Sequence, residues 1–127
     1  MARFVLDSSF LIDHARAQPS AVDRLRTMYE AGDDPIVTDV ISAEIWSGWQ
    51  ASNEEGIASL LRYFEFVQPG PVTSRLAGIW RAQARASGRT LGLTDALIAA
   101  TAHHLDAAVL TRNVRDFALT PVRIETY

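Results

Sequence analysis

Four acidic residues stand beside apolar runs that lie far apart in the sequence: Asp7, Glu44, Asp95 and Asp116. A single exposed carboxylate says nothing about function, but four of them at the ends of buried elements could converge on one point. Carboxylate oxygens are the ligands that the hard cations Mg²⁺ and Mn²⁺ prefer in proteins. The pattern therefore indicates an acidic site for a divalent cation.

Two of these acids also have a purely structural explanation at the start of a helix. Asp7 is followed by Ser8 and Ser9, and any of the three could cap a helix by accepting a hydrogen bond from a free backbone amide. Asp95 follows Thr94, a possible helix cap, and an acid in a first turn complements the helix dipole. For these residues both explanations stay open at the level of the sequence.

The other two acids differ in how easily a structural role explains them. Asp116 comes after a predicted buried strand, where a solvated loop aspartate is the simplest explanation. Glu44, however, projects onto the same helix face as Ile41 and Ile45. A carboxylate on an apolar face needs a partner, so Glu44 favours a functional site.

The elements that must position these acids alternate between short apolar strands and helices. Strands separated by helices imply crossover connections and a mainly parallel sheet with helices on both faces. In such folds binding sites gather at the carboxyl ends of the strands. We predict strands at 4–6, 36–37, 65–67, 107–110 and 122–124, and helices at 19–31, 40–50, 57–64, 72–87 and 94–104.

The composition is that of an ordinary globular protein. The 127 residues fit one domain over residues 1–127, since domains usually have about 100–200 residues. No apolar run reaches the roughly 18–20 residues of a transmembrane helix, and no signal-peptide core is present, so we expect a cytoplasmic protein without a membrane partner. The lack of cysteine excludes disulfides and thiolate metal sites.

The net charge of −3 argues at first against a nucleic-acid partner, because basic surfaces normally drive phosphate binding. All 12 basic residues, however, are arginine, and a metal site would absorb several negative charges. The spacing of Arg81, Arg85 and Arg89 is more typical of a solvated face than of an RNA-binding track. The adjacent His103 and His104 lack the spacing of a zinc-binding helix.

Taken together, these features give the chain a family resemblance over nearly its whole length. It resembles the PIN-domain ribonucleases and, within them, the VapC toxins of bacterial toxin–antitoxin pairs. No single motif is decisive, but four motifs in the right order at ordinary separations are specific. The matching segments are VLDSSFLID at 5–13, SAEIWSG at 42–48, LTDALIAA at 93–100 and LTRNVRDF at 110–117.

The resemblance implies a three-layer α/β/α sandwich with a mainly parallel sheet of about five strands, and a metal-dependent endoribonuclease site. Some relatives carry a further aspartate near the position of Asn113, so a second metal would bind weakly here or only with substrate. Ser8 stands where threonine is more common and keeps the hydroxyl. Carried over position by position, the metal and catalytic acids are Asp7, Glu44, Asp95 and Asp116, with Thr111 and Asn113 as polar neighbours.

In function, the resemblance implies the toxin of a type II toxin–antitoxin system that cleaves RNA with Mg²⁺ or Mn²⁺. We assign Asp7 and Asp95 to the metal, whereas Glu44 and Asp116 would complete the site through water molecules or orient the attacking water. The expected partners are RNA, a VapB-type antitoxin and a second copy in a homodimer, with DNA reached only through the antitoxin. Trp46 and Trp49 are predicted to be core residues, with antitoxin contact as the alternative.

Three other functions are weighed against this one. A housekeeping PIN-domain nuclease in RNA processing would use the same acids, and a catalytically silent PIN-fold binding module would keep only the fold. RNA cleavage by the purified protein separates the silent module from either nuclease. A Mg²⁺-dependent phosphatase is disfavoured, because no second aspartate lies two residues after Asp7 and the chain has no lysine to bind a phosphoryl group.

Overall fold

The sheet is built around the first strand of the chain. In the computed structural model, which describes residues 1–127, β1 (Arg3–Leu6) pairs in parallel with β2 (Asp34–Thr38) on one side and β4 (Ala108–Leu110) on the other. The edge strands β3 (Glu65–Val67) and β5 (Ile124–Glu125) are also parallel to their neighbours. The strand order is therefore β3-β2-β1-β4-β5.

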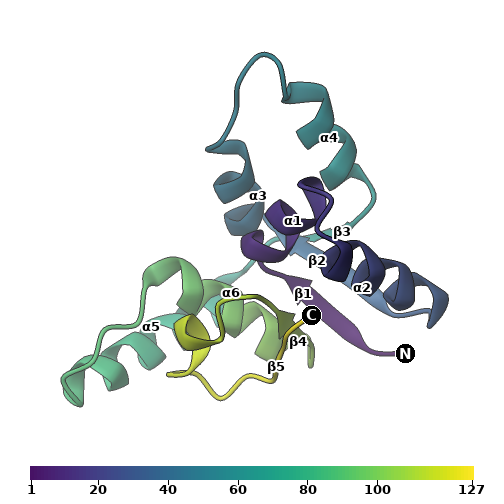
Figure 1. The fold of residues 1–127 in the computed structure, drawn as a ribbon. Helices are drawn as coiled ribbons and strands as arrows, with labels where there is room; N and C mark the ends of the chain where they lie inside the picture. Colours follow the sequence, from purple (N-terminus) through teal and green to yellow (C-terminus); the bar gives the residue numbers. More distant parts are fainter.

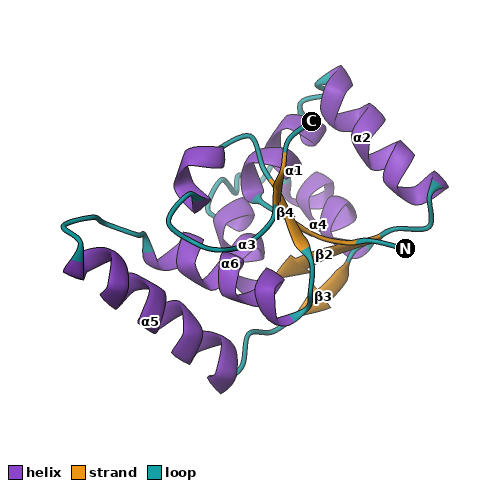
Figure 2. Ribbon diagram, turned by 90° about the horizontal axis from the view of Figure 1, so that it is seen from below, coloured by secondary structure: helices purple, strands orange, loops and turns teal.

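Helices cover both faces of this sheet, as Figures 1 and 2 show from two directions. The predicted three-layer α/β/α sandwich with about five parallel strands is confirmed. None of the helices is long and apolar enough to cross a membrane. The helices are α1 (Ser8–Ala15), α2 (Pro19–Glu30), α3 (Asp39–Trp46), α4 (Glu54–Arg62), α5 (Pro71–Ala86), α6 (Leu93–His104) and the short 3-10 helix η1 (Val114–Phe117).

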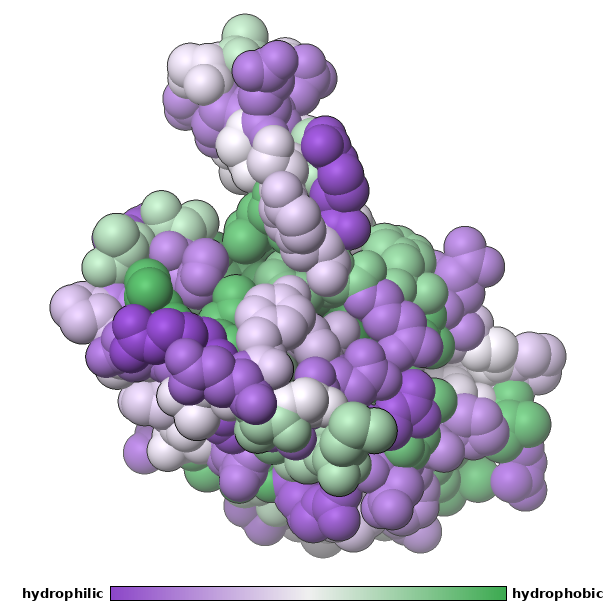
Figure 3. Space-filling model, turned by 90° about the vertical axis from the view of Figure 1, so that its right-hand side faces the viewer, coloured by the Kyte–Doolittle hydropathy of each residue, from purple (hydrophilic) through white to green (hydrophobic).

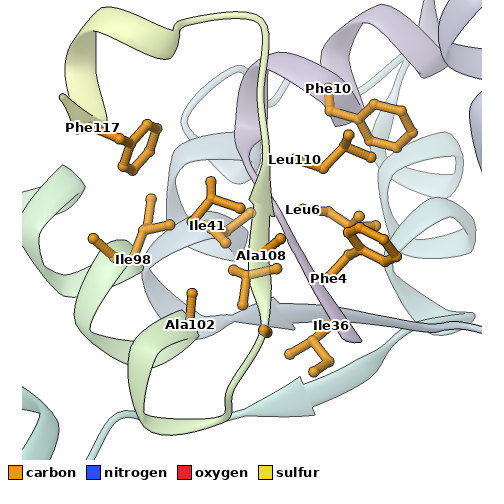
Figure 4. Packing of buried hydrophobic residues seen from close by; sticks show 14 of the residues in the cluster. Phe4, Leu6, Phe10, Ile36, Ile41, Ile98, Ala102, Ala108, Leu110 and Phe117 are labelled. Carbon is orange, nitrogen blue, oxygen red and sulfur yellow. The ribbon is translucent and has the colours of Figure 1, made fainter. Parts of the chain in front are cut away.

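The central strands are apolar on both faces, because each face of a parallel sheet packs against helices. Figure 4 shows Ile41 of α3 and Ile98 of α6 on one side of the strands, and Leu6 with Phe10 of α1 on the other. All four side chains are completely buried. This two-sided core holds the ends of the strands, and the first residues after them, in fixed positions.

Helix α6 lies deepest among the helices because nearly all its sides are apolar and small. Four of its alanines, together with Ile98, are completely buried. The helix packs against α5, α3, β1, β4 and η1. Its first turn, which carries Asp95, is thereby held beside the elements that carry the other acids.

Helix α3 ends earlier than the predicted Gln50. The side chain of Asn53 donates to the carbonyl of Gly48 (3.1 Å) and accepts from the amide of Gln50 (2.9 Å), so this backbone bonds to a side chain instead of extending the helix. Trp49 consequently lies beyond α3 and is 53% exposed, and Trp46 is only partly buried. The prediction that both tryptophans belong to the core is wrong.

The remaining boundaries differ by a few residues. Helix α4 begins at Glu54, before the predicted start at Ile57. Strand β5 begins two residues later and ends one residue later than the predicted 122–124. Helix α1 is not among the predicted helices, although Asp7, Ser8 and Ser9 are recognised as possible caps at its start. Helix α6 is capped by the backbone of Gly92, and the predicted cap Thr94 lies inside it.

Candidate acidic site at the carboxyl end of the sheet

The order of the strands creates a switch point between β1 and β4. From β1 the chain proceeds outward to β2 and β3, and it then returns to the other side of β1 to form β4 and β5. In open parallel sheets, a crevice forms outside the carboxyl ends of the strands at such a reversal. Asp7 directly follows β1 and Thr111 directly follows β4, so both lie at this crevice.

The carboxylate of Asp7 is buried and held by two hydroxyl groups. Asp7 occupies the N-cap position of α1, but its side chain makes no capping hydrogen bond. Its Oδ2 instead accepts hydrogen bonds from Ser9 Oγ at 2.9 Å and from Thr111 Oγ1 at 2.8 Å. The capping explanation for this carboxylate is therefore wrong, and the side chain is oriented by one local hydroxyl and one from the segment after β4.

Backbone amides determine the direction of these two hydroxyl groups. The amide of Arg112 donates to Ser9 Oγ at 3.1 Å, and the amide of Asn113 donates to Thr111 Oγ1 at 2.9 Å. Each hydroxyl has one proton, which is then free to point at Asp7. Both protons go to Oδ2, so Oδ1 of Asp7 has no hydrogen-bonding partner in the protein and is free for a ligand.

Asp95 provides the clearest sign that the four acids face one space. Its side chain is half-buried in the first turn of α6. The pKa of Asp95 is raised to about 6. Burial is the largest cause, and the negative charges of Asp116, Asp7 and Glu44 add to it. Three acids from separate parts of the chain therefore act on this one carboxyl group.

Gly92 leaves space for the carboxylate of Asp95 because it has no side chain. A Cβ atom added at Gly92 would lie 3.2 Å from Oδ2 of Asp95, which is closer than an ordinary van der Waals contact. Any side chain at position 92 would therefore push against the carboxylate. Gly92 is a site residue that the sequence analysis missed, and no signal in the sequence distinguishes it from an ordinary glycine before a helix.

Glu44 and Asp116 are both exposed at the rim of the crevice. Partial burial and the charge of Asp7 raise the pKa of Glu44, while the nearby Ser8 hydroxyl opposes this rise. Asp116 lies in η1, so it is held in a helical turn and not in the open loop predicted for it. Of the two predicted polar neighbours, Thr111 contributes its hydroxyl, whereas Asn113 is exposed and contributes its backbone amide.

The acids are gathered but do not yet form a closed metal site. No group of three or more His, Asp or Glu side chains has an arrangement that could hold a metal ion as it stands.

Two arginines border the acidic site. Arg89 and Arg115 line a pocket of about 320 Å³ together with Asp95 and Asp116, and both arginines are exposed. Neither forms an ion pair within the protein. Arg81 has a different role, because its Nε donates to the carbonyl of Leu91 at 3.0 Å. Arg81, Arg85 and Arg89 therefore do not form a single solvated face.

A larger groove opens on the other side of Glu44. It has a volume of about 1180 Å³ and runs between α1, α2, α3 and α4, with apolar side chains such as Ile12, Ile45 and Ile57 along its walls. Figure 3 shows α4 and the segment before it standing out from the body, with apolar side chains in the hollow at the base. We call this feature the α1–α4 groove. Neither Trp46 nor Trp49 lines it.

Comparison with known proteins identifies the family of this chain. The family model described as PIN domain matches residues 4–121. Ribonuclease VapC19 of Mycobacterium tuberculosis is 32% identical over 120 residues, covering 92% of this chain and 94% of that protein. Ribonuclease VapC10 of the same organism is 34% identical over 116 residues, covering 91% and 86%.

A solved structure shares the whole fold. The crystal structure of VapBC2 from Rickettsia felis, bound to a DNA fragment from the promoter, matches with a TM-score of 0.84 and covers 98% of each chain. At 19% identity this match concerns the fold alone. The family model and the two relatives show that the chain belongs to the PIN domain family and, within it, to the VapC proteins.

Proposed function

We propose that this protein is the toxin of a type II toxin–antitoxin pair and cleaves RNA phosphodiester bonds at its acidic site with Mg²⁺ or Mn²⁺. The single observation that carries the proposal is that Asp7, Glu44 and Asp116 gather around the half-buried Asp95, close enough for their charges to add to the effect of burial on its pKa. Four carboxylates that repel one another at the switch point of the sheet lower the stability of the fold, so a stabilising role does not explain why they lie together. The names of the two relatives, both ribonucleases, support the same reaction.

The donor set fits a hard divalent cation. It offers only oxygen atoms, and Oδ1 of Asp7 is free of protein hydrogen bonds. Two carboxylates about 4 Å apart repel by about 4 kcal/mol at an effective dielectric constant of about 20, and a cation between them removes this cost. Asp7 and Asp95 would hold the cation, and Glu44 and Asp116 would complete the site directly or through water.

A bound cation would supply an activated water molecule and neutralise the charge that develops on the phosphate oxygens. The protein's own contribution is to orient and to accept protons. Ser9 and Thr111 keep the Asp7 carboxylate in one orientation before substrate arrives. Glu44 is exposed at the rim, and its raised pKa makes it a better proton acceptor for the attacking water than an ordinary glutamate.

Arg89 and Arg115 would bind the RNA backbone beside the acids. A phosphate approaching four carboxylates is repelled, so a substrate needs positive charge at the edge of the site. Both arginines line the pocket that contains Asp95 and Asp116, and neither is neutralised by an ion pair. The planar guanidinium group binds two phosphate oxygens at once, which suits this position.

The α1–α4 groove would receive the antitoxin. Solved structures with this fold include VapBC complexes, and a VapB-type partner is proposed here by analogy. A segment with apolar side chains would cover Ile12, Ile45 and Ile57, and a basic side chain would reach Glu44 at the groove wall. We also propose a homodimer, and contact with DNA only through the antitoxin.

RNA cleavage by the purified protein tests the proposed function. The protein should cut single-stranded or looped RNA in Mg²⁺ or Mn²⁺ and stop cutting in EDTA. Asp7→Asn and Asp95→Asn should each abolish cleavage, and Glu44→Gln and Asp116→Asn should impair it severely. Circular dichroism should show an intact fold in every variant. The matched control is Glu30→Gln, which removes an exposed charge from α2 far from the crevice.

Three results would contradict parts of the proposal. Full activity of Asp7→Asn would overturn the assignment of the acids. Cleavage that continues in EDTA would remove the cation from the reaction. A folded protein that cuts no RNA under any of these conditions would favour a catalytically silent PIN-fold module.

A further inference from the structure

Asp13 is a buried acid that the acidic site does not use. It lies in α1, only 4% of its surface is exposed, and it is the other aspartate of the 5–13 segment. Burying a charge is costly unless it is paired and hydrogen-bonded. The hydrogen-bonding partners of this carboxylate therefore indicate what the buried Asp13 does in the structure.

Each oxygen atom of the Asp13 carboxylate has its own partner, and both partners come from distant parts of the chain. Arg112 Nη1 donates to Oδ1 at 2.5 Å, and the hydroxyl of Tyr127 donates to Oδ2 at 2.5 Å. The ring of Tyr127 also packs edge-on against Phe10, with 4.9 Å between the ring centroids. The contacts tie α1, the segment after β4 and the C-terminal segment together.

Arg112 connects this network to the acidic site. Its side chain is bound by Asp13, while its backbone amide donates to Ser9 Oγ, which in turn donates to Oδ2 of Asp7. Its neighbour Thr111 donates to the same Asp7 atom. A shift of the Arg112 backbone would therefore disturb both hydroxyl groups that orient Asp7.

The segment that carries Arg112 needs such an anchor. Residues 112–116 are all exposed, between the buried Thr111 and the buried Phe117. The Arg112 side chain is itself 52% exposed, whereas the Asp13 side chain is 6% exposed. Asp13 is thus the fixed member of the pair, and Tyr127 holds it from the opposite side.

We propose that Asp13, Arg112 and Tyr127 form a positioning network that holds Asp7 in the orientation required to bind the divalent cation. The three residues touch neither the cation nor the RNA, and they act through the Arg112 amide and Ser9. The inference rests on the proposed function for its catalytic consequence. The effect of the network on cation binding does not depend on that function, because the affinity of Asp7 and its neighbours for a cation is measured without RNA.

The test uses Tyr127→Phe, which removes one hydroxyl and keeps the ring on Phe10. Two quantities are measured on the full-length protein: Mn²⁺ affinity by calorimetry without RNA, and kcat and KM for cleavage of a short RNA. We expect Mn²⁺ to bind several-fold more weakly and kcat to fall about tenfold with KM unchanged, because small misplacements of catalytic groups are costly. Asp13→Asn should have a larger effect in the same direction.

Two further variants separate positioning from general stability. Asp23→Asn breaks an aspartate–arginine pair of the same kind on α2, where Arg26 Nη2 lies 2.8 Å from Asp23 Oδ1, and should change neither quantity. In a Ser9→Ala background the link from the Arg112 amide through the Ser9 hydroxyl to Asp7 is already broken. Adding Tyr127→Phe to Ser9→Ala should therefore cause little further loss, since residues that act along one path are not additive.

The outcomes decide the proposal separately from the proposed function. Unchanged Mn²⁺ affinity in folded Tyr127→Phe, or losses that simply multiply in the Ser9→Ala background, would overturn the positioning network. A wild-type protein that binds Mn²⁺ but cuts no RNA would contradict the proposed function, while the Mn²⁺ affinities would still decide the network. Thermal unfolding of each variant shows whether a loss reflects unfolding alone.

Discussion

The hydroxyl of Thr111 lies 2.8 Å from Oδ2 of Asp7, although the two residues are 104 positions apart in the sequence. The contact exists because β1 and β4 are neighbours in a parallel sheet, so the residues that follow them emerge side by side. Asp7 shares this atom with a hydroxyl from its own helix, that of Ser9. One support is therefore local and the other depends on the whole fold.

Replacing Thr111 with valine should test the distant support. Valine has nearly the same shape but cannot donate to Asp7 or accept from the Asn113 amide. We expect RNA cleavage to fall about tenfold and the free energy of unfolding to fall by about 1–3 kcal/mol, the usual cost of a buried group that loses its partner. Cleavage kinetics and urea unfolding measure the two effects. Thr101→Val is the control, since that hydroxyl bonds within α6 to Leu97 and should not affect cleavage.

A methyl group at Gly92 should disturb Asp95. The added carbon would lie 3.2 Å from Oδ2, so the carboxylate must move by a few tenths of an ångström. Gly92→Ala should reduce cleavage several-fold and leave the melting temperature nearly unchanged. Gly78→Ala is the matched control, because an added Cβ meets nothing within 4 Å there and alanine favours the α5 helix. Equal activity in both variants would show that the position of Asp95 is not critical.

Mn²⁺ should stabilise the folded protein. A ligand that binds only the folded state raises the free energy of unfolding by about 2.7 kcal/mol at a hundredfold excess over its Kd. The melting temperature of the wild type should therefore rise with Mn²⁺ concentration, and that of Asp7→Asn should respond much less. A wild-type melting temperature that is indifferent to Mn²⁺ would mean that the acids do not bind a cation together.

The raised pKa of Asp95 predicts a pH dependence in the metal-free protein. Its ordinary value is 3.8 and its value in the folded protein is about 6, so the folded state binds the proton more tightly than the unfolded state. The stabilisation by this proton is present below pH 3.8 and is lost as the pH rises through about 6.

Asp95→Asn isolates this effect, because the amide does not titrate. In EDTA, the variant should be more stable than the wild type above pH 6, and this advantage should shrink as the pH falls toward 4. Melting temperatures of both proteins across this range provide the measurement. An advantage that does not change with pH would indicate that the pKa of Asp95 is not raised in the folded protein.

Expression in a bacterial host tests the biological role. The protein alone should arrest growth, because an exposed ribonuclease site acts on cellular RNA unless a partner covers it. Co-expression of the short protein encoded beside it should restore growth, and the two should purify as a complex. Asp7→Asn should be harmless while still binding that partner, since the apolar walls of the α1–α4 groove are unchanged.

The result of the growth experiment also distinguishes the alternatives. Equal toxicity of the wild type and Asp7→Asn would separate the growth arrest from metal-dependent cleavage. Harmlessness of both would favour a housekeeping role in RNA processing.

Much of the fold could be predicted from local patterns. Short apolar strands alternate with helices, and this order requires crossover connections, so a parallel sheet with two covered faces follows directly. The boundaries were less predictable where side chains decide them. The side chain of Asn53 bonds to the backbone of Gly48 and Gln50 and so ends the helical hydrogen bonds after α3. The pattern of apolar residues does not predict this end of the helix.

By itself, the sequence determined which groups could do the chemistry: four carboxylates beside buried elements, all oxygen donors, in a chain without cysteine or lysine. Only the tertiary structure decided how they are supported. Ser9, Arg112 and Gly92 act on the acids through contacts whose geometry depends on the packing of β1, β4, α1 and α6. Residue types and local periodicity are properties of short segments, whereas a hydrogen bond across 104 residues depends on which strands become neighbours.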